Sequence, residues 1–131
     1  MTIWLAQAVQ LALDNAAAGQ LPFGAVVVRD GTVLATGVNT EVRDVDPTAH
    51  AEVAAVRNAC RQLGTRFIEG ATIYSSCEPC AICVGVAAAA GVTRIVYAAP
   101  KEFIPGLGNP PPRPAVVYEE TPGARGPFGE R

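Results

Sequence analysis

The alternation of apolar and polar residues in the first third of the chain predicts a helix followed by a β-hairpin. Residues 3–18 carry apolar side chains at helical spacing, and Gly19 ends that helix. Residues 23–28 are apolar and rich in valine, which is typical of a strand, and residues 32–37 are expected to return beside them. The dipeptide Asp30-Gly31 between the two runs is a hairpin-turn signal.

The pattern then predicts two helices that alternate with two strands. Residues 39–45 are polar and predict a loop. Asp46-Pro47 is a helix-start signal, because Asp is a good N-cap and Pro fits the first helical position, and Glu78-Pro79 repeats it. The predicted elements are a helix from this signal to about Leu63, a strand over 71–76, a helix over 80–90 and a strand over 94–99. Strands on either side of a helix should be parallel, so we expect an α/β fold with one sheet and helices on its faces.

The composition supports one domain with a hydrophobic core. Of the 131 residues, 50% are hydrophobic and 17% are charged, which excludes wholesale disorder. The net charge is −2, and the Lys and Arg residues are scattered along the sequence. This distribution argues against a nucleic-acid partner and favours a small-molecule substrate.

We expect no membrane partner and a cytoplasmic location. No apolar run approaches the roughly 20 residues of a membrane-spanning helix, and the N-terminus lacks a secretory signal pattern. The four cysteines should therefore be reduced. In that compartment, closely spaced cysteines are metal ligands or catalytic groups.

Two short motifs carry the candidate chemistry: His50-Ala51-Glu52 and Pro79-Cys80-Ala81-Ile82-Cys83. Cys80 and Cys83 are three residues apart at a predicted helix start, so their sulfur atoms should face the same way. With His50, the only histidine in the chain, they make three protein ligands and leave the fourth position of a tetrahedral zinc open, as in catalytic zinc sites. Together the motifs match the H-x-E and P-C-x-x-C signature of zinc deaminases.

Other interpretations of these residues stay open at this level. A C-x-x-C pair alone also occurs in redox sites and in structural zinc sites. Cys77 is a possible further ligand, whereas Cys60 is expected in the core. The site could also be the zinc staple of a non-catalytic binding module. Glu52 argues against that, because a structural zinc site does not need this carboxylate.

The sequence resembles the cytidine deaminase-like superfamily, and within it the branch of bacterial guanine deaminases and tRNA adenosine deaminases. The resemblance covers about residues 3–99 and rests on segments that occur in the family's order. These segments are residues 22–28, Asn39, residues 46–53 and residues 75–83. The resemblance implies a three-layer α/β/α sandwich around a mixed five-stranded sheet, a zinc ion and a homodimer.

The resemblance also implies roles for individual residues. It places Glu52 at the zinc as the group that moves protons, although helical spacing alone does not put Glu52 on the same face as His50. It implies that Asn39, Ala51 and Phe23 contact the substrate, while a turn asparagine and a core phenylalanine remain the alternatives for two of them. The implied reaction is hydrolytic deamination, in which an exocyclic amine of a small heterocyclic base becomes a carbonyl and ammonia leaves.

The chain departs from guanine deaminases beyond the second motif. An alanine run occupies residues 87–90, and a proline-rich segment over 105–114 stands where that family has acidic residues. The expected substrate is therefore a base of the guanine, cytosine or aminotriazine type. The alternative function is that of a tRNA adenosine deaminase.

The composition changes near Pro100, because most of the eleven prolines lie from there onward. We expect a zinc deaminase domain over residues 1–103 and a Pro/Gly-rich tail or lid over 104–131, both within one domain. Residues 116–118 could add a short strand. The tail is either frayed or an extended arm over the active site or a neighbouring subunit, from which Phe103 or Phe128 could stack on the base.

Overall fold

The chain folds into helices and strands in the order that the sequence predicts, apart from one additional short helix. A computed structural model describes residues 3–108 and 110–129. The description leaves out residues 1–2, 109 and 130–131. The first residues of the predicted domain over 1–103, and residue 109 and the last residues of the predicted tail over 104–131, therefore lie outside the described residues. The elements are α1 (Ile3–Ala17), β1 (Gly24–Arg29), β2 (Thr32–Val38), α2 (Glu41–Asp44), α3 (Ala51–Leu63), β3 (Thr72–Cys77), α4 (Ala81–Ala89), β4 (Arg94–Ala99) and the 3-10 turns η1 (Lys101–Phe103) and η2 (Gly126–Phe128).

The strands form one mixed sheet with the order β2-β1-β3-β4. β1 and β2 are an antiparallel hairpin, and Asp30 and Gly31 at its turn both have positive φ, as the predicted turn requires. β1 also pairs antiparallel with β3, whereas β3 and β4 are parallel. The predicted parallel pair is therefore confirmed.

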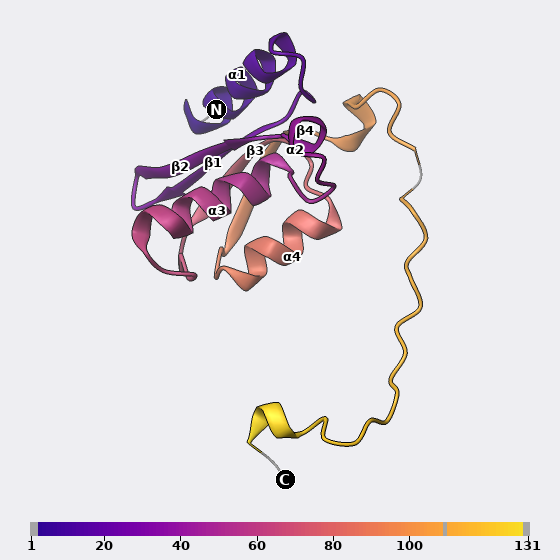
Figure 1. Cartoon of the computed structure of the whole chain (residues 1–131). Helices are drawn as coiled ribbons and strands as arrows, with labels where there is room; N and C mark the ends of the chain where they lie inside the picture. Colours follow the sequence, from indigo (N-terminus) through magenta and orange to yellow (C-terminus); the bar gives the residue numbers. More distant parts are fainter. Residues whose placement is uncertain (1–2, 109, 130–131) are drawn as a thin grey trace.

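Helices cover both faces of the sheet, with α1 on one face and α3 and α4 on the other (Figure 1). β1 contributes to two cores because its side chains alternate between the faces. Val26 and Val28 pack with Ala8 and Tyr74 under α1, while the neighbouring Val27 belongs to the cluster beneath α3 and α4. The three-layer α/β/α fold class is confirmed.

Gly37 sets how closely α3 approaches the sheet. A Cβ atom at Gly37 would lie within van der Waals overlap of the Ala55 amide nitrogen and the Ala51 carbonyl oxygen. Only glycine allows this backbone-to-backbone contact between β2 and α3. The first turn of α3 is thereby held against the end of the sheet where the motif residues meet.

The start of α3 differs from the prediction. Asp46-Pro47 does not begin the helix, because the Asp46 carboxylate accepts hydrogen bonds from the backbone N–H and the hydroxyl of Thr48, at 2.9 and 2.7 Å, and closes a separate turn. His50 is the N-cap, and α3 begins at Ala51. The same local chemistry creates α2 inside the predicted loop, since Asn39 Oδ1 accepts the Glu41 backbone N–H at 3.0 Å.

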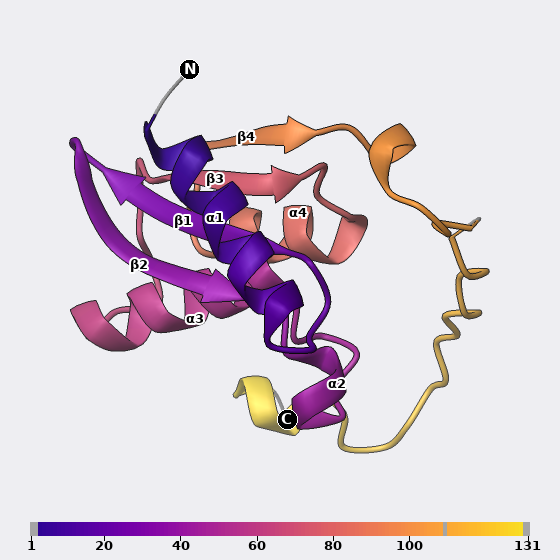
Figure 2. The same cartoon turned by 90° about the horizontal axis from the view of Figure 1, so that it is seen from above.

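The described part of the tail adds no strand to the sheet. Figures 1 and 2 show it running away from β4, with η2 near its end. Residues 116–118 are exposed and form no strand, so the described sheet has four strands and not the five that the resemblance implies. The many prolines before them lack the N–H groups that a strand would donate. Within residues 3–108 and 110–129, no helix has the length and apolar character needed to cross a bilayer.

Candidate active site

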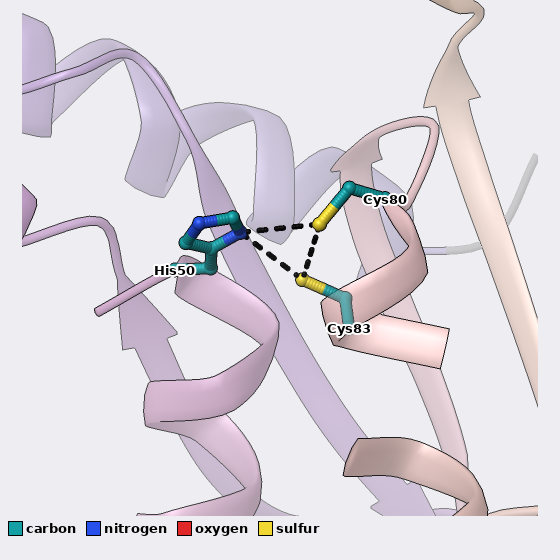
Figure 3. A group of neighbouring side chains, drawn as sticks. All are labelled: His50, Cys80 and Cys83. Carbon is teal, nitrogen blue, oxygen red and sulfur yellow. Dashed lines mark hydrogen bonds between the residues drawn. The ribbon is translucent and has the colours of Figure 1, made fainter. Parts of the chain in front are cut away.

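The two motif helices begin at the same point of the molecule. His50 is the N-cap of α3 and Cys80 is the N-cap of α4, both with extended backbone conformations. Cys83 lies one turn into α4 and is 1% exposed. Figure 3 shows the imidazole and the two thiols pointing toward one another from these helix ends. The structure therefore brings together the three residues that the sequence predicts as metal ligands.

The geometry of this cluster fits a zinc ion. Nδ1 of His50 lies 3.3 Å from Cys80 Sγ and 3.4 Å from Cys83 Sγ, and the two sulfur atoms are 3.5 Å apart. Ordinary Zn–N and Zn–S bond lengths at tetrahedral angles require separations of about 3.6 Å for N and S and about 3.8 Å for two sulfurs. His50, Cys80 and Cys83 are thus arranged for metal binding.

The environment of the Cys83 thiol disfavours its ionised form when no cation is bound. Burial, together with the negative charges of Glu52 and Cys80, raises the pKa of the Cys83 thiol far above its usual range. A metal ion reverses this balance, because a coordinated thiol loses its proton outright. Cys77 lies nearby, where burial and the charge of Glu52 raise its pKa to about 11. Among the described residues, Cys77 does not belong to the ligand cluster, and Cys60 packs against the core as predicted.

The second nitrogen of His50 has a carboxylate partner. Nε2 lies 2.7 Å from Glu41 Oε1 and 3.0 Å from the Pro47 carbonyl oxygen. Both partners are acceptors, so they favour the tautomer that carries its proton on Nε2 and leaves Nδ1 free to bind a metal. No motif in the sequence connects Glu41 to His50, because Glu41 lies in the polar segment over 39–45 that predicts a loop.

Glu52 is the second residue of α3 and is buried, with 5% of its surface exposed. Burial raises the pKa of its carboxyl, while hydrogen bonds from its own backbone N–H and the Cys83 thiol and the charge of His50 act in the opposite direction. Glu52 lies in the first turn of α3. It therefore lies within hydrogen-bonding reach of Cys83, one of the candidate metal ligands.

A cavity of about 1000 Å³ opens in front of this cluster. Its lining includes Glu52 and the three residues predicted to contact substrate: Phe23, Asn39 and Ala51. The Asn39 side chain has two parts with separate roles. Its Oδ1 atom accepts the Glu41 N–H, whereas its Nδ2 has no hydrogen-bond partner in the described part of the chain and is available to the cavity.

The segment after β4 forms another wall of the same cavity. The Lys101 backbone N–H donates to the Glu78 carboxylate at 3.2 Å and holds η1 beside the second motif. Ile104, Leu107 and Pro111 then line the cavity. Phe103 and Phe128 are 72% and 84% exposed, and neither lines it, so the structure gives no support to their stacking on a base.

Residues 2–99 match the family of the cytidine and deoxycytidylate deaminase zinc-binding region, and the chain belongs to this family. It is 45% identical to the guanine deaminase of Bacillus subtilis over 97 residues, which cover 73% of this chain. It is 35% identical to the tRNA-specific adenosine deaminase of Aquifex aeolicus over 81 residues, which cover 62% of this chain. The X-ray structure of the Bacillus subtilis guanine deaminase superposes with a TM-score of 0.80 and 37% identity, covering 98% of this chain and 92% of that one.

The matched regions span only part of the two curated relatives, 62% of the guanine deaminase and 54% of the adenosine deaminase. One of these relatives is specific for tRNA. The comparisons therefore do not support the exclusion of nucleic acid that the charge distribution suggested.

Proposed function

We propose that this protein is a zinc-dependent hydrolytic deaminase of a small heterocyclic base. The observation that carries the proposal is the juxtaposition of a three-ligand cluster with a buried carboxyl on the wall of one large cavity. A structural zinc site would be closed by a fourth protein ligand and would need neither the carboxyl nor the cavity.

His50, Cys80 and Cys83 would hold the zinc. When bound, zinc supplies a Lewis acid that lowers the pKa of water to about 7 and so provides a nucleophile at neutral pH. Glu41 would be a positioning residue, because its contact with Nε2 fixes the orientation of the His50 ring.

Glu52 would be the catalytic acid and base. Its carboxylate would accept a proton from the attacking water and give it to a ring nitrogen of the substrate. It would then take the remaining hydroxyl proton of the adduct, which leaves the carbonyl, and give it to the exocyclic amine, which departs as ammonia. Its burial excludes competing water, and its raised pKa makes it a better base than an exposed glutamate. Water and the amino-substituted base are thus converted to the oxo-substituted base and ammonia.

The cavity wall would hold the base in front of these groups. The free Nδ2 of Asn39 would donate to a ring or carbonyl acceptor of the substrate, and Phe23 and Ala51 would supply the apolar surface against which a flat ring packs. The base would be covered by another wall of the cavity, formed by Ile104, Leu107, Gly108, Pro110 and Pro111. In this proposal residues 1–103 provide the catalytic domain and the later residues enclose its site.

The substrate would be a free base of the guanine, cytosine or aminotriazine type. Guanine is the first to test, because the guanine deaminase of Bacillus subtilis is similar over most of this chain. The competing function is adenosine deamination in tRNA, which the similarity to the Aquifex aeolicus enzyme favours. We include a cytoplasmic homodimer in the proposal, since the cysteines are free and α4 exposes Ile82 and Val84.

Ammonia release from a matched panel of substrates tests the proposal. The panel contains guanine, cytosine, adenine and an aminotriazine, the corresponding nucleosides, and a tRNA anticodon stem-loop. We expect one free base to give the highest kcat/KM. A higher value for any nucleoside or for the stem-loop would overturn the free-base assignment, and zinc-loaded protein inactive on the whole panel would favour a binding module.

A further inference from the structure

A second cavity, of about 590 Å³, lies beside the active-site cavity and shares α2 with it. Glu41 of α2 lines the active-site cavity, whereas Arg43 and Asp44 of the same short helix line the second one. The remaining walls come mainly from β2 and α3. Nothing in the proposed deamination uses this second cavity.

Three arginines that are scattered in the sequence converge on this cavity: Arg43 from α2, and Arg57 and Arg61 from α3. Asp44 is the only carboxylate among the described residues that line it. Asp44 is already engaged, since it lies 2.9 Å from Arg43 Nε and accepts the Thr40 hydroxyl at 2.8 Å. The lining therefore carries an excess of positive charge.

The two arginines of α3 have hydrogen-bonding capacity to spare. Arg57 makes one long contact of 3.4 Å with the Thr48 hydroxyl. It also lies within electrostatic range of Asp46, but that carboxylate is occupied by Thr48. Arg61 has no hydrogen bond or ion pair within the described ranges of the chain. Each guanidinium carries five N–H donors, so most donors of this pair face solvent or the cavity.

The spacing of this pair places two like charges close together. Arg57 and Arg61 are one helical turn apart on α3, where like charges destabilise a helix. The chain as a whole has a net charge of −2, so a general excess of basic residues does not explain the cluster. An anion bound between the two guanidinium groups would be attracted by both and would offset their mutual repulsion.

We propose that the Arg43–Arg57–Arg61 cavity binds the phosphate group of a small phosphorylated molecule. The planar fork of arginine matches phosphate oxygens in pairs, and the cavity volume falls within the range of small-molecule sites. A small ligand is favoured over an RNA strand because the three arginines line a single cavity. The other arginines before the tail, Arg29, Arg66 and Arg94, do not line it.

Equilibrium binding of uridine monophosphate to the zinc-loaded protein tests the proposal. This nucleotide lacks an exocyclic amine, so it cannot be deaminated, and uridine is the matched probe without phosphate. We expect binding of the monophosphate and of inorganic phosphate, and no binding of uridine. The double variant Arg57→Gln/Arg61→Gln should lose at least tenfold in affinity for the monophosphate. Arg94→Gln, which alters an exposed arginine of β4 outside the cavity, should bind as wild type does.

The changed side chains are exposed, so both variants should fold, and their melting temperatures verify this. Absence of binding by both phosphate probes at millimolar concentration overturns the proposal. An equal loss in Arg94→Gln also overturns it, because the attraction would then be non-specific. Binding of a short RNA through Arg57 and Arg61, without binding of the mononucleotide, would overturn the small-molecule proposal and assign the cavity to a nucleic acid. None of these measurements depends on turnover, so they stand apart from the test of deamination.

Discussion

The Oε1 atom of Glu41 lies 2.7 Å from Nε2 of His50, whereas the other ring nitrogen, Nδ1, faces the two cysteine sulfurs (Figure 3). This contact connects a four-residue helix to the candidate metal centre. Outer carboxylates of this kind typically change metal affinity by about 10–100-fold. We therefore expect Glu41→Gln to bind zinc roughly tenfold or more weakly in competition with a fluorescent chelator. Glu102→Gln alters an acidic residue of the same cavity that does not touch His50, and it should keep wild-type affinity. Equal zinc affinities of both variants and wild type would show that Glu41 does not support the metal site.

Replacement of a single ligand should abolish stoichiometric zinc binding. Wild-type protein should contain about one zinc per chain, and Cys83→Ala should lose it because only two ligands remain. Its melting temperature should fall as well, since metal binding is coupled to folding. Cys77→Ala is the matched control, because Cys77 lines the cavity without belonging to the cluster. Metal analysis that finds full zinc in Cys83→Ala would contradict the ligand assignment.

Glu52→Gln separates catalysis from metal binding. The amide has nearly the same shape but cannot accept and return a proton, so turnover should fall by about 10²–10⁴-fold. Zinc content and the melting temperature should stay close to those of wild type, because Glu52 is not one of the clustered ligands. Steady-state ammonia release together with metal analysis provides the measurement. A variant that retains turnover within tenfold of wild type would show that another group moves the protons.

The exposed side of α4 is the expected dimer interface. Ile82 and Val84 are 46% and 50% exposed on a helix that carries no charged residue. We expect Val84→Asp to shift a dimer to monomer, because it would bury an unpaired charge in the interface. Leu13→Asp on α1, where the side chain is 59% exposed, should remain dimeric. Sedimentation velocity measures both, and a wild-type monomer at micromolar concentration would refute the interface.

Val45 strains the junction between α2 and the turn before α3. It is the C-cap of α2, with φ 49° and ψ 51°, a left-handed conformation that β-branched residues disfavour. Because the side chain is 89% exposed, little packing is lost on replacement. Val45→Asn should raise stability by about 1 kcal/mol and the melting temperature by roughly 3–5 °C. Val42→Asn, at an exposed position within α2, should give no such gain in a thermal melt.

The sequence was sufficient to predict the four strands of the described sheet, the helices α1, α3 and α4 and the candidate metal ligands, because these depend on local periodicity and motif spacing. His50, Cys80 and Cys83 each occupy a helix start that fixes their direction. Helix α3 starts later than predicted because Asp46 accepts its hydrogen bonds within its own turn and does not cap the helix. The dipeptide Asp-Pro is compatible with both hydrogen-bonding patterns, so the sequence alone does not distinguish them.

Glu41 and the arginine cavity could not be predicted in the same way. Glu41 reaches His50 only because Asn39 and the following residues fold the predicted loop into α2. Arg43 and Arg57 lie far apart in the sequence, and net charge averaged over the chain conceals their convergence. Both features depend on tertiary contacts of α2, a short helix that the sequence pattern does not predict.

Because His50 is the only histidine of the chain, the candidate metal centre carries its own spectroscopic label. Incorporation of nitrogen-15 histidine would place two ring-nitrogen resonances in an otherwise empty region of the NMR spectrum. One would report on the nitrogen that faces Cys80 and Cys83, and the other on the nitrogen held by Glu41. Metal loading, tautomer and the state of α2 could then be followed in the intact protein without a single substitution.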